Sequence, residues 1–282
     1  MAMEARDRVV VNSRIPRRWV CGVDFSGARD AGERIWIARC SIGEDALHVS
    51  DLFQAKYLPG SGKERKLSHR ALASFIGEQK DAIFGLDFPF SLPRDLVYGK
   101  TWEEFVLTFG KAFRSPEDFR ERCRSEASGR ELKRTTDIVS RTPFSPYNLR
   151  VYRQTYFGIR DVLAPLIRAD LARILPMQQP RDGKAWVLEI CPASTLTREQ
   201  LRAPYKGRAE VRRTARIKIL QALEKRLQLG VATSVGRSNI AEDCGGDALD
   251  SVIAAYAAFR ASRNSFGCDA AFPYEREGWV YV

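Results

Sequence analysis

Two apolar segments of the chain each contain an aspartate at the point where a buried strand should end. The first segment reads WVCGVDFSG (residues 19–27) and carries Asp24, and the second reads GLDFPFS (residues 85–91) and carries Asp87. A lone ionised carboxylate in an apolar environment costs several kcal/mol unless it is paired, hydrogen-bonded or bound to a metal ion. These two residues therefore limit the chain to folds that bring a partner to both strand ends.

The patterns around these two strands predict an α/β fold. Residues 34–42 and 44–55 read as further strands, joined to the strand 19–25 by short polar turns, which is typical of an antiparallel meander. Residues 63–79 carry apolar side chains at helical spacing, and the strand 82–89 follows them. The chain thus opens in the order strand, strand, strand, helix, strand.

The middle of the chain is predicted to be mainly helical. Helices are expected over 101–113 and 115–127, the second of which begins with the favourable start Ser-Pro-Glu-Asp. Residues 145–175 read as one long helix that Pro165 breaks or kinks.

The last third of the chain alternates again between strands and helices. The predicted elements are a strand over 185–191, an amphipathic helix over 208–229, a loop over 233–246, a helix over 247–262 and a closing strand at 278–282. In the helix 208–229 we expect Val211 to face inward and the arginines at 212, 213 and 216 to face solvent.

Length and composition predict one globular domain. The chain has 282 residues, of which 44% are hydrophobic and 29% charged, enough to bury a core. We expect residues 1–17 to be a flexible extension and residues 18–282 to be a single domain. No apolar run of about 18 residues is present, so no membrane span is expected. The N-terminus has no signal-peptide pattern.

The histidine and cysteine content restricts the chemistry. The chain has two histidines, His48 and His69, and neither is near a plausible nucleophile, which disfavours triad chemistry and histidine metal sites. The six cysteines form no C-x-x-C pair, which favours a reducing, cytoplasmic location over a disulfide framework or a zinc site. Carboxylates are left as the main candidates for catalysis.

The charge of the chain favours a polyanionic partner. The formal net charge is +11, and residues 198–226 contain ten basic and three acidic side chains. Arg212, Arg213 and Arg216 are predicted to form a basic ridge that contacts nucleic acid, DNA or RNA. The alternative is an ordinary solvated face.

Three further acids stand at the ends of predicted elements. Glu189 lies near the end of the strand 185–191, and Asp247 and Asp250 share one face at the start of the helix 247–262. If the first and fourth strands are neighbours, their carboxyl ends and these acids meet at one edge of the sheet. Gathered carboxylates repel one another, and a hard cation such as Mg²⁺ or Mn²⁺ relieves that repulsion. Two such ions, about 3.5–4 Å apart, can activate a water and hold the leaving oxygen of a phosphodiester.

Each acid also has a structural alternative. Asp24 could begin a turn, Asp87 could hydrogen-bond local backbone, and Glu189 could pair with a nearby arginine. Asp247 could cap its helix, and Asp250 could be a surface acid that the helix dipole favours.

Five segments give the chain a family resemblance. GVDFSG, GLDFPFSLP, EICPAST, PFSPYNLRVYRQTYFGIRD and GGDALDSVIAAYAA…EGWVYV resemble, in this order, an uncharacterised family of predicted nucleases of the ribonuclease-H fold, domain of unknown function 429. The resemblance implies a mixed sheet, antiparallel in strands one to three and parallel in strands four and five. Helices flank this sheet, and a helical cap insertion over about 94–182 separates strands four and five.

The resemblance also implies a metal site. The placement of the acids is similar to that in bacterial Holliday-junction resolvases of the same superfamily, in which an acid on strand one, an acid on strand four and a D-x-x-D on the last helix bind Mg²⁺. The matching residues here are Asp24, Asp87, Asp247 and Asp250. Those resolvases require no acid at the position of Glu189, which we keep as a further catalytic candidate.

Other side chains are candidates for contacts with a phosphate or a base. Ser26, Gly27 and Ser91 directly follow the two strand-end carboxylates, so they either contact phosphate or shape tight turns. A second group of candidates interleaves arginine and aromatic side chains: Arg150, Arg153 and Tyr156. The alternative is that this second group packs on the core.

Three functions are consistent with these patterns. The first is a Mg²⁺-dependent nuclease that hydrolyses phosphodiester bonds. The second is a non-catalytic nucleic-acid-binding protein with a vestigial acidic site. The third is an enzyme with the actin-like fold that binds ATP or phosphate, since GVDFSG also resembles the first phosphate loop of that class.

Overall fold

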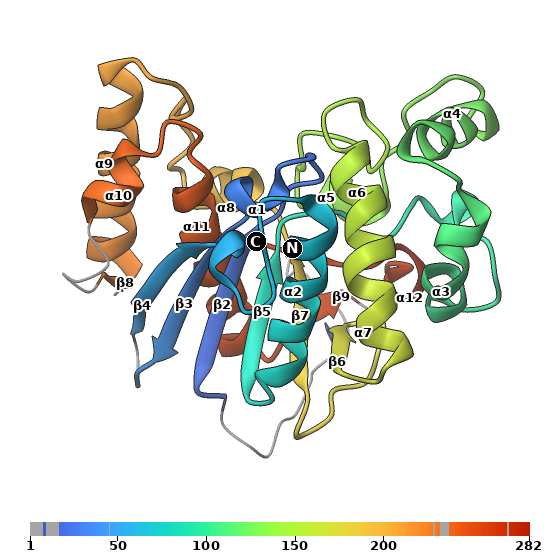
Figure 1. The fold of residues 1–282 in the computed structure, drawn as a ribbon, viewed down its shortest axis with the longest axis horizontal. Coiled ribbons are helices and arrows are strands. Elements are labelled where there is room, and N and C mark those ends of the chain that lie inside the picture. The colour runs from blue at the N-terminus through green and yellow to red at the C-terminus, as the bar shows by residue number, and fades with distance from the viewer. Residues whose placement is uncertain (1–7, 10–16, 45, 228, 232–236, 270) are drawn as a thin grey trace, which may run out of the picture.

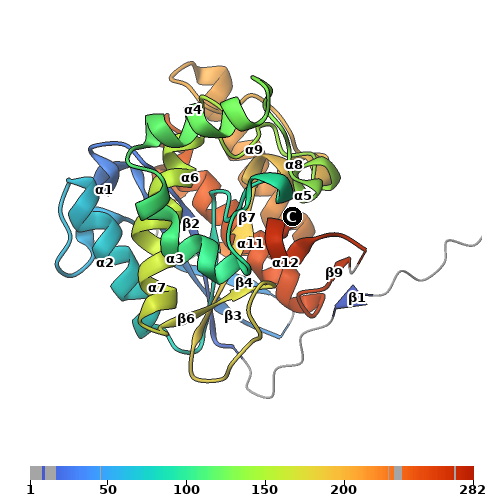
Figure 2. The same ribbon diagram turned by 90° about the vertical axis from the view of Figure 1, so that its right-hand side faces the viewer.

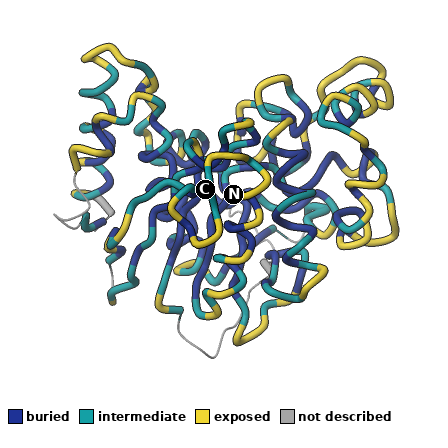
Figure 3. Tube along the Cα trace, in the orientation of Figure 1, coloured by how far each residue is buried: buried dark blue, intermediate teal, exposed yellow. Residues whose placement is uncertain are grey.

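The computed structural model describes residues 8–9, 17–44, 46–227, 229–231, 237–269 and 271–282. Within these residues a mixed eight-stranded sheet forms the centre of the molecule, and helices cover both of its faces (Figure 1). The strands and the inner sides of the helices are buried (Figure 3).

The sheet contains the strands β2 (Trp19–Asp24), β3 (Trp36–Ile42), β4 (Leu47–Gln54), β5 (Ala82–Leu86), β6 (Ala172–Leu175), β7 (Ala185–Ile190), β8 (Leu229–Val231) and β10 (Val280–Tyr281). Its order is β10-β7-β5-β2-β3-β4-β8, and β6 also pairs with β7. Neighbouring strands β2, β3 and β4 are antiparallel, whereas β5 runs parallel to β2 and β7 parallel to β5. The predicted ribonuclease-H-like sheet is therefore confirmed, and the first and fourth predicted strands are neighbours.

The helices are α1 (Ala31–Arg34), α2 (Arg65–Glu78), α3 (Trp102–Ala112), α4 (Pro116–Glu126), α5 (Thr135–Val139), α6 (Tyr152–Gly158), α7 (Ala164–Arg168), α8 (Pro192–Arg198), α9 (Glu210–Leu227), α10 (Arg237–Glu242), α11 (Asp247–Arg263) and α12 (Tyr274–Glu277). Short 3-10 turns lie at Ala55–Tyr57 and Arg94–Leu96. The predicted N-caps of α3 and α4 are confirmed, because Thr101 and Ser115 each accept a backbone N–H three residues later.

The two faces of the sheet have separate cores. On one face α11 packs along β2, β3 and β5, with α8 and α9 beside it. On the other face lie α2 and the helices between β5 and β7, including α6 and α7. Figure 2 shows the sheet between these two layers. The segment predicted as a helical insertion thus supplies most of the second layer.

The predicted helix 145–175 is partly wrong. Helices α6 and α7 are joined by a π-helical turn at Ile159–Leu163, and Pro165 lies in the first turn of α7. A proline in that position loses no helical hydrogen bond, so it does not break the helix. Residues 172–175 form β6, because they pair with β7, a long-range partner that local spacing does not reveal.

Two expectations for the last third are also wrong. The region predicted as a loop over 233–246 contains α10. On α9, Arg216 is 2% exposed and Val211 is 67% exposed, the reverse of the predicted orientation. The buried guanidinium of Arg216 is possible because three backbone carbonyls accept its hydrogen bonds.

At the N-terminus, strand β1 (Arg8–Val9) pairs with β9 (Cys268–Asp269). The rest of the predicted flexible extension, apart from Arg17, lies outside the described residues. In the described part of the chain, no helix is both long enough and apolar enough to cross a membrane.

Candidate metal and phosphate site

Helix α11 lies directly against β2 and β5 because each strand carries a glycine at the contact. A Cβ on Gly22 would stand 1.9 Å from the carbonyl oxygen of Ser251, and one on Gly85 would stand 2.7 Å from that of Ala254. Gly22 and Gly85 are register partners in the sheet. The two glycines therefore fix both the height and the position of α11 over the sheet.

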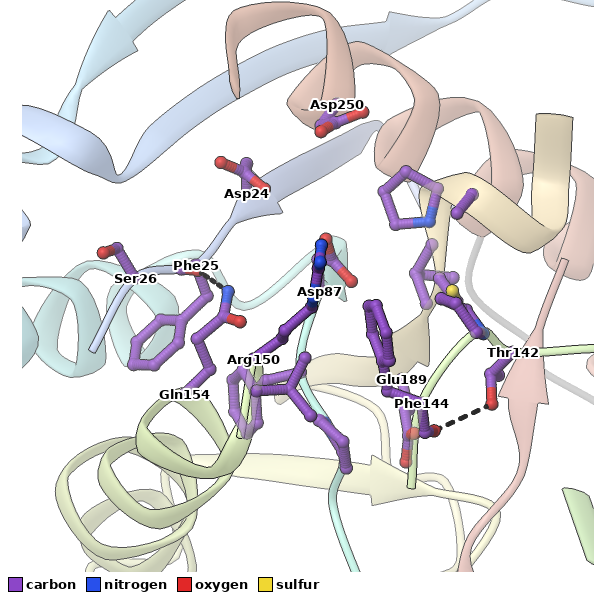
Figure 4. A pocket seen from close by; sticks show the side chains of 18 of the residues that line it. Asp24, Phe25, Ser26, Asp87, Thr142, Phe144, Arg150, Gln154, Glu189 and Asp250 are labelled. Atoms are coloured by element: carbon purple, nitrogen blue, oxygen red, sulfur yellow. Dashed lines mark hydrogen bonds between the residues drawn. The ribbon is translucent and has the colours of Figure 1, made fainter. Parts of the chain in front are cut away.

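From this contact, the regular periods of strand and helix bring four aspartates together. Two residues further along each strand, on the same face, come Asp24 and Asp87. One helical turn earlier on α11, on the same side, come Asp247 and Asp250. All four line one cavity of about 460 Å³. Figure 4 shows Asp24, Asp87 and Asp250 around this space, each from a different element.

The four carboxylates, hereafter the acid cluster, disfavour their own ionisation. Burial first, and then the charges of Asp250, Asp247 and Asp87, hold the pKa of Asp24 well above its ordinary value. Burial, followed by the charge of Asp250, raises the pKa of Asp87 to about 7. Burial also raises the pKa of Asp247 and that of Asp250. A bound cation would relieve both the burial cost and the mutual repulsion.

Two neighbours of the acid cluster were not predicted as site residues. The Nζ of Lys206 lies 2.7 Å from Oδ2 of Asp250 and 3.7 Å from Oδ1 of Asp247. The hydroxyl of Tyr205 donates to Oδ1 of Asp250 at 2.5 Å. The segment 205–206 lies more than 40 residues before α11, and its sequence carries no signal beyond one residue of the basic excess.

Glu189 faces the other side of the sheet. Its register partner on β5 is Leu86, so the alternation of the strand separates it from Asp87. Arg134 donates to both carboxylate oxygens of Glu189, and the N–H of Phe90 donates to Oε2 at 2.9 Å. Arg134 also pairs with Asp137 at 2.8 Å. The structure thus shows Glu189 paired with an arginine at the edge of the cavity, and its catalytic role stays a prediction.

The predicted contact residues separate into two groups. Ser26 and Arg150 line the cavity together with the acid cluster. Arg150 is exposed, and its guanidinium lies 5.5 Å from the ring centroid of Phe144. Among the described residues, no acidic side chain forms an ion pair with Arg150. This leaves its guanidinium available to an anion entering the cavity.

The other predicted contact residues do not line this cavity. Gly27 packs under α6, where a Cβ would stand 2.6 Å from the carbonyl oxygen of Arg153. Ser91 is fully buried and donates to the carbonyl of Arg276. Tyr156 is 1% exposed and donates to the carbonyl of Phe113, so it presents no ring face for stacking.

Four arginines complete this second group. Arg153 pairs with Glu117 at 2.8 Å, and Arg213 pairs with Glu242 at 2.6 Å. Arg212 donates to the carbonyl of Pro204, beside the cavity, and Arg216 is buried beneath the same loop. The predicted ridge of three arginines is therefore not a continuous surface feature.

The acid cluster supplies the right donor atoms for a hard cation. Across the described ranges, no three acidic, histidine or cysteine side chains stand close enough, as they are, to form a metal site. Asp250 has both oxygens engaged, by Tyr205 and by Lys206. The chemistry of the set, four carboxylates with raised pKa values around one cavity, nevertheless fits Mg²⁺ or Mn²⁺. Asp24, Asp87 and the α11 pair would hold such an ion.

Strand order and acid placement define a ribonuclease-H-like α/β protein with an acidic cavity at the carboxyl ends of β2 and β5. The chain belongs to the family described as "Protein of unknown function (DUF429)", whose model matches residues 22–277. The family predicted from the sequence is thereby confirmed. No curated protein matches the chain.

One solved structure is similar at a distance. The crystal structure of the yeast mitochondrial Holliday junction resolvase Ydc2 is 11% identical, with a TM-score of 0.35, over 88% of this chain and 85% of that chain. A similarity of this size assigns no residue and no activity, so both must come from the site itself.

Proposed function

We propose that the protein is a Mg²⁺- or Mn²⁺-dependent nuclease that hydrolyses phosphodiester bonds of nucleic acid. The observation that carries the proposal is the convergence of Asp24, Asp87, Asp247 and Asp250 around one open cavity. Such a set is costly without a cation and is the usual equipment of metal-assisted phosphoryl chemistry.

The metal would supply activation of a water molecule and stabilisation of the negative charge that develops on the phosphodiester. The chain's own residues would do the rest. Asp24 and Asp87 end adjacent parallel strands, so a rigid sheet sets their separation. Arg150, on the opposite wall, is placed to bind a phosphate through its fork of N–H donors.

A basic path that continues from the cavity supports nucleic acid as the substrate. The cavity shares Ala193, Tyr205 and Lys206 with a second hollow, which in turn shares Ala203, Pro204 and Arg212 with a third. The charged residues that line the second and third hollows are all basic: Arg202, Lys206, Arg212 and Lys218. An extended polyanion is the partner that such a path fits.

The test is the replacement Asp24→Asn, which keeps the shape of the side chain and removes its charge. In wild-type protein we expect cleavage of DNA or RNA with Mg²⁺ or Mn²⁺ and none with EDTA. Asp24→Asn should lower that cleavage by about 100-fold or more. The control is Asp95→Asn, whose side chain is 87% exposed; it should cleave like wild type.

Two other outcomes would replace the proposal. Undiminished metal-dependent cleavage by Asp24→Asn would show that the proposed site is wrong. Salt-dependent binding of nucleic acid, without cleavage under any divalent ion, would favour the non-catalytic binding protein.

A further inference from the structure

The loop that carries Lys206 is fixed from below by a buried arginine. Arg216 is 2% exposed, and its Nη1 donates to the carbonyls of Tyr205 at 2.7 Å and Gly207 at 3.1 Å. Its Nε donates to the carbonyl of Ala241 at 2.8 Å. The backbone on both sides of Lys206 is therefore held in place, and the position of its side chain over the acid cluster is set by the fold.

The head group of Lys206 sits where a cation is most needed. It lies 2.7 Å from Asp250 and 3.7 Å from Asp247, and it is also the cation that acts on Asp24. Arg34 lines the same cavity but forms its ion pair with Asp30 at 2.8 Å. Lys206 is thus the cation in direct contact with the acid cluster among the described residues.

The two partners of this ion pair differ in freedom. The side chain of Asp250 is 4% exposed, whereas that of Lys206 is 54% exposed. Asp250 cannot leave the cavity without moving α11, but the ammonium of Lys206 can turn into solvent on its flexible stem. A competing cation would therefore displace the lysine and leave the carboxylate in place.

We propose that Lys206 is a built-in counter-cation of the acid cluster, and that it competes with the divalent metal ion for Asp250. The inference rests on the proposed function. It also gives a physical reason why no three carboxylates stand at metal-ligand spacing here: one of them is turned to the lysine and to Tyr205.

The first experiment measures Mn²⁺ binding to full-length protein by calorimetry at low salt. Lys206→Met removes the charge and keeps the length, so we expect Mn²⁺ to bind about tenfold tighter or more. Lys206→Arg should bind close to wild type. Lys218→Met is the matched control, because it removes one positive charge from the exposed side of α9; a general charge effect would tighten both Met variants equally. A Kd for Lys206→Met that equals that of Lys218→Met, or exceeds that of wild type, overturns the competition.

The second experiment separates this inference from the proposed function by using EDTA-treated protein. Without metal, Lys206→Met should unfold at a temperature a few degrees lower at pH 8, because the acid cluster loses its counter-cation. Adding Asp250→Asn to that variant should restore most of the loss. An unchanged Tm, or a loss that Asp250→Asn does not restore, overturns the counter-cation role. Absence of Mn²⁺ binding in every variant would overturn both the proposed function and the competition, while the Tm result would still decide the counter-cation role.

Discussion

The fold keeps carboxylates at Asp24 and Asp87 although their surroundings favour the protonated form. Asp24 is 7% exposed, and Asp87 continues β5 with its N–H donating to the carbonyl of Val23 at 3.0 Å. Both side chains are therefore held on rigid backbone and cannot turn away from one another. The expense is justified physically if a cation arrives, since a metal ion converts repulsion into coordination.

This arrangement predicts how stability depends on pH. The pKa of Asp87 in the folded state, about 7, lies above its ordinary value of 3.8. Protonation therefore favours folding, so the stabilising contribution is complete below about pH 4 and is lost as the pH rises through 7. In EDTA, wild-type protein should lose more unfolding free energy between pH 5 and pH 8 than Asp87→Asn, as measured by urea denaturation. Parallel pH curves for the two proteins would contradict the prediction.

Arg134 should be among the most sensitive single positions in the molecule. It is 1% exposed and pairs with Glu189 and Asp137, which are also buried. Arg134→Met leaves two carboxylates without their cation, and we expect it to lower the unfolding free energy by about 3–5 kcal/mol. Arg94→Met, at a side chain that is 65% exposed, is the control and should change little. Adding Glu189→Gln to Arg134→Met should recover part of the loss; no recovery would show that the pair is not the cause.

At the scale of single residues, the sequence identifies charges that interrupt apolar runs. Asp24 and Asp87 are visible in this way because each stands alone in a strand-like segment. Arg134 and Lys206 are not visible, since their partners are 55 and 44 positions away and lie on other elements. Arg216 is misread because a helical pattern cannot show that backbone carbonyls await a buried guanidinium.

At the scale of elements, the site depends on how closely α11 approaches the sheet. Gly22→Ala places a methyl group against the backbone of α11, 1.9 Å from the oxygen of Ser251. Because backbone cannot yield as a side chain can, we expect a loss of about 3 kcal/mol and weaker Mn²⁺ binding. The control is Gly43→Ala, where the nearest atom is 3.4 Å away. Denaturation curves that coincide for the two variants would mean that α11 is not held by this contact.

The elements that the sequence predicts correctly are those whose signal is local. α2, α4 and α11 have apolar spacing and favourable helix starts within their own residues. Strand β6 and helix α10 are missed because they depend on distant parts of the chain: β6 pairs with β7, and α10 packs on α9 and α11. The convergence of the four aspartates was expected from strand order, but the two glycines that set it were not noticed.

At the scale of the whole molecule, the net charge of +11 should govern affinity for nucleic acid. Arg150 lines the cavity, and we expect Arg150→Ala to weaken oligonucleotide binding and to reduce the salt dependence by about one phosphate contact. Binding should be measured by fluorescence anisotropy at several salt concentrations in EDTA, which prevents cleavage. Arg153→Ala, on the same helical segment but paired with Glu117, should have a smaller effect. Equal slopes for wild type and Arg150→Ala would remove this arginine from the path.

The most direct test of the central claim is an anomalous difference map from a crystal soaked in Mn²⁺. The account predicts a peak between Asp24 and Asp87 at the start of α11, with Lys206 turned away from Asp250. A well-ordered cavity that stays free of anomalous signal at saturating Mn²⁺, with Lys206 still on Asp250, would contradict the claim that these carboxylates form a metal site.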